Sequence, residues 1–249
     1  PIKAMMTMFP LLFWDIIVTE INRYAEQKLC KKKYTSVPKN KNLISGYKWI
    51  PVTLNEVLCY FGILIYFMLY PQTGRHLRDA LDSPYNNAWL KYMSKGRFLQ
   101  ISSVLHFNNN DDEEAKRCDS LHKVRPLLNI VKKTLGRYAT FGSKVSYDEA
   151  TMANKLSYGW SLICYNPMKP TGKFHFKIYM LCCAKTNLTL RMKIHTKDNS
   201  DVDGDENFDE MMNKLDNATV QICRPLFQSG TTVNMDNYYM STTCAMKLR

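Results

Sequence analysis

Asp148 and Glu149 are the only acidic residues in a long basic stretch of the chain. From Lys144 to Lys197 the sequence holds nine Lys and Arg residues and just these two acids. They directly follow Lys144–Tyr147, a short candidate strand. A strand fixes the backbone while the loop after it stays open, so functional side chains collect at strand ends. The position therefore suits a carboxylate that does chemistry.

A second carboxylate, Asp236, stands in the same way at the end of the candidate strand Thr231–Met235. Carboxylates at the ends of neighbouring strands can share one hard cation such as Mg²⁺. Two such ions, about 3.5–4 Å apart, can clamp the attacking and leaving oxygens of a phosphodiester. A carboxylate after a strand is also a common turn or cap residue. The spacing alone leaves both interpretations open.

The elements before Gly142 have helical periodicity. The expected helices are Met5–Leu29, Thr53–Leu69, Ser94–His106 and Pro126–Tyr138. Thr53 and Glu56 have the spacing of a capping box, in which each side chain satisfies a free backbone N–H group. Polar loops are expected at Lys31–Lys41 and Asn108–Ser120.

After Gly142 the apolar period changes from 3.6 to 2, which indicates strands. Lys144–Tyr147, Phe174–Cys182 and Leu188–Ile194 are expected to be adjacent strands, followed by helix Glu206–Arg224, strand Thr231–Met235 and helix Thr242–Leu248. This order predicts a mixed α/β (α+β) fold, with an α-helical part over residues 1–142 and a catalytic α/β core over residues 143–249.

Composition and charge favour a folded protein with a polyanionic partner. The 249 residues are 45% hydrophobic and carry a net charge of +12, and such an excess favours nucleic acid. Lys169, Lys173 and Lys177 could hold DNA phosphates or form a solvated basic face. The longest apolar run, Val57–Tyr70, has 14 residues, which is short of the roughly 20 that span a membrane. We expect no membrane association.

Other features admit a bland interpretation. The eight cysteines include no C-x-x-C pair, so we expect reduced thiols without a zinc site. Trp160 and Tyr165 could stack on bases, although buried packing is the favoured interpretation. Asn199–Glu210 has the spacing of a calcium loop, but an acidic surface loop that caps the following helix fits it better.

Several segments together resemble piggyBac transposases, in family order over nearly the whole chain. They are Trp49–Glu56 with Tyr60–Ile65, Met93–Phe98 with Leu105–Asn108, Lys123–Leu127, Ser146–Glu149, Tyr165–Pro170 with Gly172–Cys182, and Met235–Ser241. Ser146-Tyr-Asp148-Glu149 is similar to the first catalytic motif of that family, and Met235-Asp236-Asn237-Tyr238 to the second.

The resemblance implies an RNase-H-like catalytic core preceded by an α-helical domain. It also implies three metal-binding aspartates that use Mg²⁺ or Mn²⁺ to cut and join DNA, the DDD motif. Asp148 would be the first and Asp236 the second, each catalytic and metal-binding. The third is expected beyond Arg249, so we expect a C-terminally truncated core that is inactive as a fragment.

Two departures from the family pattern concern DNA handling. The segment after Glu149 lacks the Arg that many members carry, and Cys183 stands where the family often has Asp. The alternative hypothesis is a host-retained, catalytically inactive, DNA-binding protein derived from a transposable element. DNA as partner, a possible homodimer and a nuclear location follow from the resemblance in either case.

Overall fold

The computed structural model describes residues 2–32, 49–69, 88–138, 140–154, 159–169, 172–197 and 212–248. The chain divides into two compact units. The first comprises Pro1–Asp112 with Lys123–Leu127, and the second comprises Glu113–His122 with Leu128–Arg249.

The described elements of the first unit are helical. They are α1 (Ile2–Met8), α2 (Leu11–Lys32), α3 (Leu54–Leu69), the 3₁₀ turn η1 (Ala88–Lys91) and α5 (Lys95–Val104). One expected helix, Met5–Leu29, is in fact two, because Pro10 lacks the N–H that a continuous helix requires. The expected loop at Lys31–Lys41 lies mostly outside the described residues, although α2 continues to Lys32.

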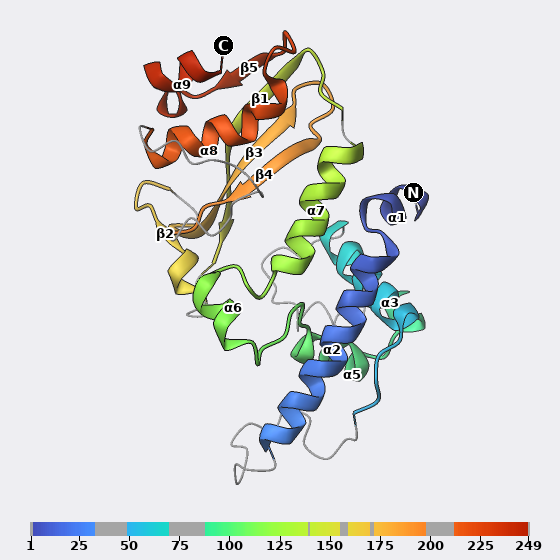
Figure 1. Cartoon of the computed structure of the whole chain (residues 1–249). Coiled ribbons are helices and arrows are strands. Elements are labelled where there is room, and N and C mark those ends of the chain that lie inside the picture. The colour runs from blue at the N-terminus through green and yellow to red at the C-terminus, as the bar shows by residue number, and fades with distance from the viewer. Residues whose placement is uncertain are drawn as a thin grey trace. The chain divides into compact units, whose positions relative to one another are not determined.

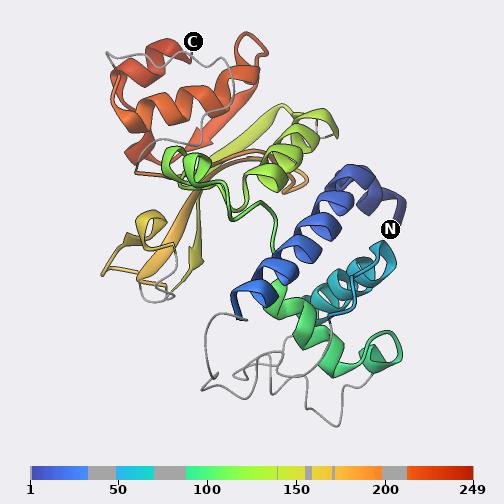
Figure 2. The same ribbon diagram turned by 60° about the horizontal axis from the view of Figure 1, so that its bottom comes forward.

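The core of this unit forms where α2 meets α3 and α5, which Figure 2 shows side by side. Its most buried side chains are Trp14, Ile17, Ile21, Val57, Ile63, Phe98 and Ile101. Thr53 and Glu56 form the predicted capping box at the start of α3. Arg97 donates to the Glu56 carboxylate at 2.8 Å. That bond is the main reason that the pKa of Glu56 is lowered.

The first part of the second unit is helical where a loop was expected. The expected polar loop Asn108–Ser120 contains a short helix, α6 (Glu113–Cys118). Its two glutamates lie in the first turn and its two basic residues in the last, which complements the helix dipole. The helix expected over Pro126–Tyr138 is present as α7 (Arg125–Tyr138), whose first residues belong to the first unit.

The second unit is built on a sheet of five strands (Figure 1). They are β1 (Lys144–Ala153), β2 (Cys164–Tyr165), β3 (Phe174–Cys183), β4 (Thr189–Ile194) and β5 (Thr232–Met235). β1 lies between β3, to which it is antiparallel, and β5, to which it is parallel. β2 and β4 both pair with β3. The predicted adjacency of the first three long strands is therefore confirmed.

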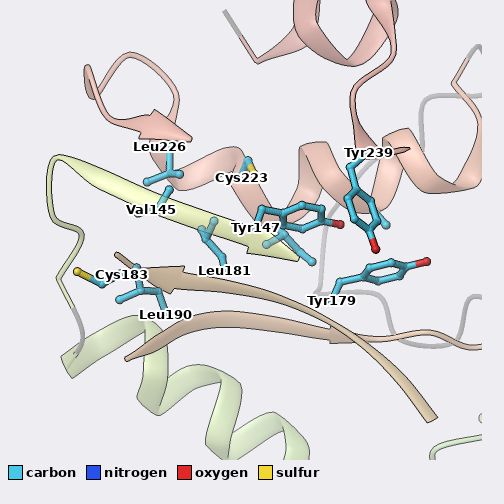
Figure 3. Packing of buried hydrophobic residues seen from close by; sticks show 11 residues of the cluster. Val145, Tyr147, Tyr179, Leu181, Cys183, Leu190, Cys223, Leu226 and Tyr239 are labelled. Atoms are coloured by element: carbon cyan, nitrogen blue, oxygen red, sulfur yellow. The ribbon is translucent and has the colours of Figure 1, made fainter. Parts of the chain in front are cut away.

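The helices α8 (Lys214–Cys223) and α9 (Thr242–Lys247) complete this unit, together with η2 (Trp160–Leu162), η3 (Arg224–Leu226) and η4 (Asn237–Tyr239). Helix α8 starts at Lys214 with Asn213 as its cap. The predicted earlier start, at Glu206, and the calcium-like segment Asn199–Glu210 lie outside the described residues. Tyr147, Leu181 and Leu190 pack in one cluster with Ile222 of α8 (Figure 3).

The hydropathy of the helices and the state of the cysteine thiols complete the description of the fold. Within the described residues, none of the helices combines the length and the apolar character that crossing a bilayer requires. The structure shows free thiols at Cys59, Cys118, Cys164, Cys182, Cys183, Cys223 and Cys244.

We predict that Leu181→Ala lowers the free energy of unfolding by about 2–5 kcal/mol, because a fully buried leucine leaves a cavity. The exposed Leu188, seven residues further on, supplies the control. Leu188→Ala should change stability by no more than about 0.5 kcal/mol. Urea unfolding followed by circular dichroism measures both variants. Equal losses would contradict this assignment of the core.

Candidate active site

Asp148 lies within strand β1 and not after its end, which corrects the sequence-based expectation. The strand continues to Ala153, because β3 has ten residues and pairs with it as far as His175. The parallel ladder with β5 is shorter and ends at Tyr147, opposite Met235. Asp148 is therefore the first residue of β1 beyond the β5 ladder.

Asp236 is the first residue after β5, so the two aspartates occupy matching positions one step beyond the pair Tyr147 and Met235. Residues in register on parallel strands face the same side of a sheet. Tyr147 and Met235 both pack in the cluster against α8. Asp148 and Asp236 accordingly belong to the opposite face, and both are exposed.

Each aspartate also makes a local hydrogen bond. Asp148 Oδ1 accepts from the backbone N–H of Glu149 at 2.7 Å. Asp236 Oδ1 accepts from the N–H of Tyr238 at 2.7 Å and so caps η4. These bonds orient the two carboxylates and engage one oxygen of each. The turn and cap role that the sequence left open is thus present at Asp236.

Glu149 belongs to the other face, toward α8, because successive residues of a strand alternate. Its carboxylate accepts from the hydroxyl of Tyr239, which lies three residues after Asp236. It also pairs with Lys177 Nζ of β3 at 3.0 Å and with Lys169 Nζ at 3.5 Å. Glu149 therefore joins β1, β3 and the segment after β5.

The Lys177 ammonium is enclosed by aromatic rings. It lies 5.1 Å from the Tyr179 ring centroid, 5.3 Å from that of Tyr238 and 5.7 Å from that of Tyr239. Its side chain is 16% exposed. Figure 3 shows the rings of Tyr147, Tyr179 and Tyr239 gathered at one end of the cluster. Burial is the main reason that the pKa of Tyr179 rises to about 12, so the Tyr179 hydroxyl remains a neutral donor at pH 7.

The three lysines predicted to bind DNA have different surroundings. Lys177 and Lys169 reach Glu149, whereas Lys173 is exposed at the turn between β2 and β3. These contacts give Lys177 a structural partner on the α8 face. Phosphate binding by the three lysines stays a prediction.

Trp160 and Tyr165 are not buried, so the favoured packing interpretation is wrong. Their exposed fractions are 58% and 59%. Trp160 is the first residue of η2 and Tyr165 is the last residue of β2. Ring contacts with Phe174 hold each in place.

Cys183, at the position where the resemblance implies an Asp, ends β3 with its thiol among turn donors. A hydrogen bond from the Thr186 hydroxyl, followed by the N–H groups of Thr186 and Lys185, lowers the pKa of Cys183 to about 7. A carboxylate would accept from the same donors, so the substitution preserves an acceptor at this turn.

A divalent cation fits the aspartate pair only in part. Oxygen donors suit Mg²⁺ or Mn²⁺, and the two aspartates directly follow Tyr147 and Met235, the last register pair of the β1–β5 ladder. Among the described residues, however, no group of three or more His, Cys, Asp or Glu side chains is placed to hold a metal ion. The pair can contribute two ligands and leaves the remaining positions to other donors.

The sequence pattern of the family described as Transposase IS4 matches residues 1–249 of this chain. The chain belongs to this transposase family. A solved structure with the same fold is the cryo-EM structure of the piggyBac transposase synaptic complex with hairpin DNA. Its TM-score is 0.78 at 19% sequence identity, over 99% of this chain and 47% of the solved one. This chain thus spans about half the length of the piggyBac transposase chain.

The sequence does not reveal the Glu149 contacts, since Tyr239 lies 90 positions further along the chain. We predict that Tyr239→Phe lowers stability by about 1–3 kcal/mol, because Glu149 loses a partly buried donor. Tyr238→Phe is the control, since it keeps the ring beside Lys177 and removes an exposed hydroxyl. Urea unfolding should show a change within about 0.5 kcal/mol for the control.

We also predict a pH dependence at His195. Burial and then the charges of Lys177, Lys214 and Lys197 lower the pKa of His195, which packs on the edge of Tyr179. Below pH 6.5, about the usual pKa of a histidine, His195 then binds a proton more readily in the unfolded chain than in the folded chain. Stability should therefore be full above about pH 6.5 and fall below it.

His195→Gln should flatten this slope. Urea unfolding at several pH values between 5 and 8 compares the two proteins. Identical pH profiles would contradict the assignment of the slope to His195.

Proposed function

We propose that this chain is part of a piggyBac-type DNA transposase with an RNase-H-like core, in which Asp148 and Asp236 are two of the three metal-binding catalytic aspartates. The observation that carries the proposal is their register: matching positions beyond the β1–β5 ladder, on one exposed face. The family assignment and the shared fold support it. The chain spans 47% of the piggyBac transposase chain. Cutting and joining of DNA is therefore proposed for the whole protein to which this chain belongs.

Asp148 and Asp236 would hold Mg²⁺ or Mn²⁺ through their carboxylate oxygens. When bound, such an ion supplies charge stabilisation at the phosphodiester oxygens that attack and leave. The chain itself orients the pair: backbone N–H groups fix both carboxylates, and the Glu149 contacts hold β1 against the segment after β5. A third ligand from elsewhere would complete the site.

The proposed partner is DNA, since the piggyBac neighbour forms a synaptic complex with hairpin DNA. The basic excess is concentrated in residues 1–197, which hold 30 Lys and Arg against 13 Asp and Glu. Exposed Lys173 and partly exposed Lys169 suit phosphate contacts best, with Lys177 more enclosed. We also propose a nuclear location, where such a partner is found, and assembly as a homodimer.

We predict that Mn²⁺ or Mg²⁺ raises the melting temperature of the chain modestly, by mass action on the folded state. Asp148→Asn and Asp236→Asn should each abolish the response. Asp15→Asn removes an equal charge on α2 of the other unit and should leave the response intact. Differential scanning calorimetry with and without metal measures the shift. A response that survives in both site variants would contradict the metal assignment.

We predict salt-sensitive DNA binding that is largely independent of sequence, because neutralised phosphates release counterions. A change in salt from about 50 to 200 mM should weaken binding to any duplex steeply. Fluorescence anisotropy with two unrelated duplexes tests this. Affinity that is indifferent to salt would refute DNA as the partner. Retained binding without any metal response would favour the alternative, a catalytically inactive DNA-binding protein.

A further inference from the structure

Three aromatic rings lie in a row at the end of the β2–β3 hairpin. The Phe174 ring is central, with its centroid 5.7 Å from that of Trp160 and 4.8 Å from that of Tyr165. The interplanar angles are 37° and 36°. The two outer rings are more than half exposed. We call Trp160, Tyr165 and Phe174 the aromatic row.

The backbone holds this row firmly. Tyr165 and Phe174 are register partners in the β2–β3 ladder, and Asn166 extends that ladder by donating its N–H to the Lys173 carbonyl at 2.8 Å. The buried Ile163 anchors the segment between Trp160 and β2. Exposed aromatic surface on an ordered hairpin loses little conformational entropy on binding.

The aromatic row shares a sheet face with the candidate active site. Asp148 pairs with Met180 of β3, and alternation places Phe174 on the same face as Met180, six residues along that strand. At about 3.3 Å per residue, the row lies roughly 20 Å from Asp148 along the strand. Between them Met152, opposite Phe176, adds exposed apolar surface to this face.

The charge around the row selects an anionic occupant. The sequence holds no acidic residue from Ala150 to Lys197, and the exposed Lys173 lies in the hairpin itself, next to Phe174. Flat rings on a basic surface suit nucleobases, which have π-faces on a phosphate backbone. Duplex DNA keeps those faces stacked inside the helix, so only unpaired nucleotides can use the rings.

We propose that the aromatic row binds unpaired nucleotides of single-stranded DNA by stacking, on the same sheet face as Asp148 and Asp236. This inference rests on the proposed function. It specifies the form of DNA that binds: a strand with unpaired bases that runs along this face of the sheet toward Asp148 and Asp236. Trp160 and Tyr165 supply the stacking surfaces, and Phe174 supports both.

The test compares three probes of equal length: oligo(dT), the same backbone with abasic sites, and a duplex. The abasic strand offers the charge without the bases. The intact chain should bind oligo(dT) about 5- to 100-fold more tightly than the abasic strand, the range expected for one stacked base. Binding should also quench part of the tryptophan emission, because Trp14 and Trp89 are buried whereas Trp160 is exposed.

Trp160→Ala and Tyr165→Ala should each remove most of the preference for oligo(dT) and leave duplex affinity unchanged. Tyr165→Phe keeps the ring and should retain the preference. Tyr92→Ala, at an exposed tyrosine of the first unit, is the matched control and should behave like the unaltered chain.

Each outcome decides a separate claim. Equal affinity of the intact chain for oligo(dT) and the abasic strand, with duplex binding intact, would overturn the aromatic row and spare the proposed function. Failure to bind any of the three probes would overturn both. Tighter binding to oligo(U) than to oligo(dT) would overturn DNA as the occupant of the row.

Discussion

The ion pair and hydrogen bond at Glu149 are the contacts on which the candidate active site depends. Glu149 is held on the α8 face by Lys177 of β3 and by Tyr239, three residues after Asp236. Successive strand residues must face opposite sides. An anchored Glu149 therefore directs Asp148 to the exposed face, and the Tyr239 contact holds Asp236 beside it. One partly buried network thus positions the backbone at both aspartates without touching either carboxylate.

Much of this architecture could be predicted from the sequence, because alternation and capping are local signals. The strands around Phe174 and Leu190 and the Thr53–Glu56 capping box follow from spacing alone. The continuation of β1 beyond Tyr147 could not be predicted in this way. It depends on the length of β3, and a register between distant segments leaves no periodic trace in either one.

The sequence could name the two candidate aspartates and the strands that carry them, but it could not show which face of the sheet they occupy. Isolated acids in a basic stretch pointed to Asp148, and a motif pointed to Asp236, but their shared face follows only from the β1–β5 register. The burial of Trp160 and Tyr165 was predicted wrongly, because aromatic residues usually pack inside. Here Tyr165 ends a two-residue strand and Trp160 opens a three-residue 3₁₀ turn, and more than half of each side chain is exposed.

Anomalous diffraction from crystals soaked in Mn²⁺ would show directly whether Asp148 and Asp236 share one divalent cation. We expect an anomalous peak within about 2–2.6 Å of a carboxylate oxygen of each aspartate, the range of oxygen ligands to such ions. The peak should be absent from Asp148→Asn crystals grown in the same way. A well-ordered structure with the two carboxylates more than about 12 Å apart, or a peak at neither, would contradict the claim.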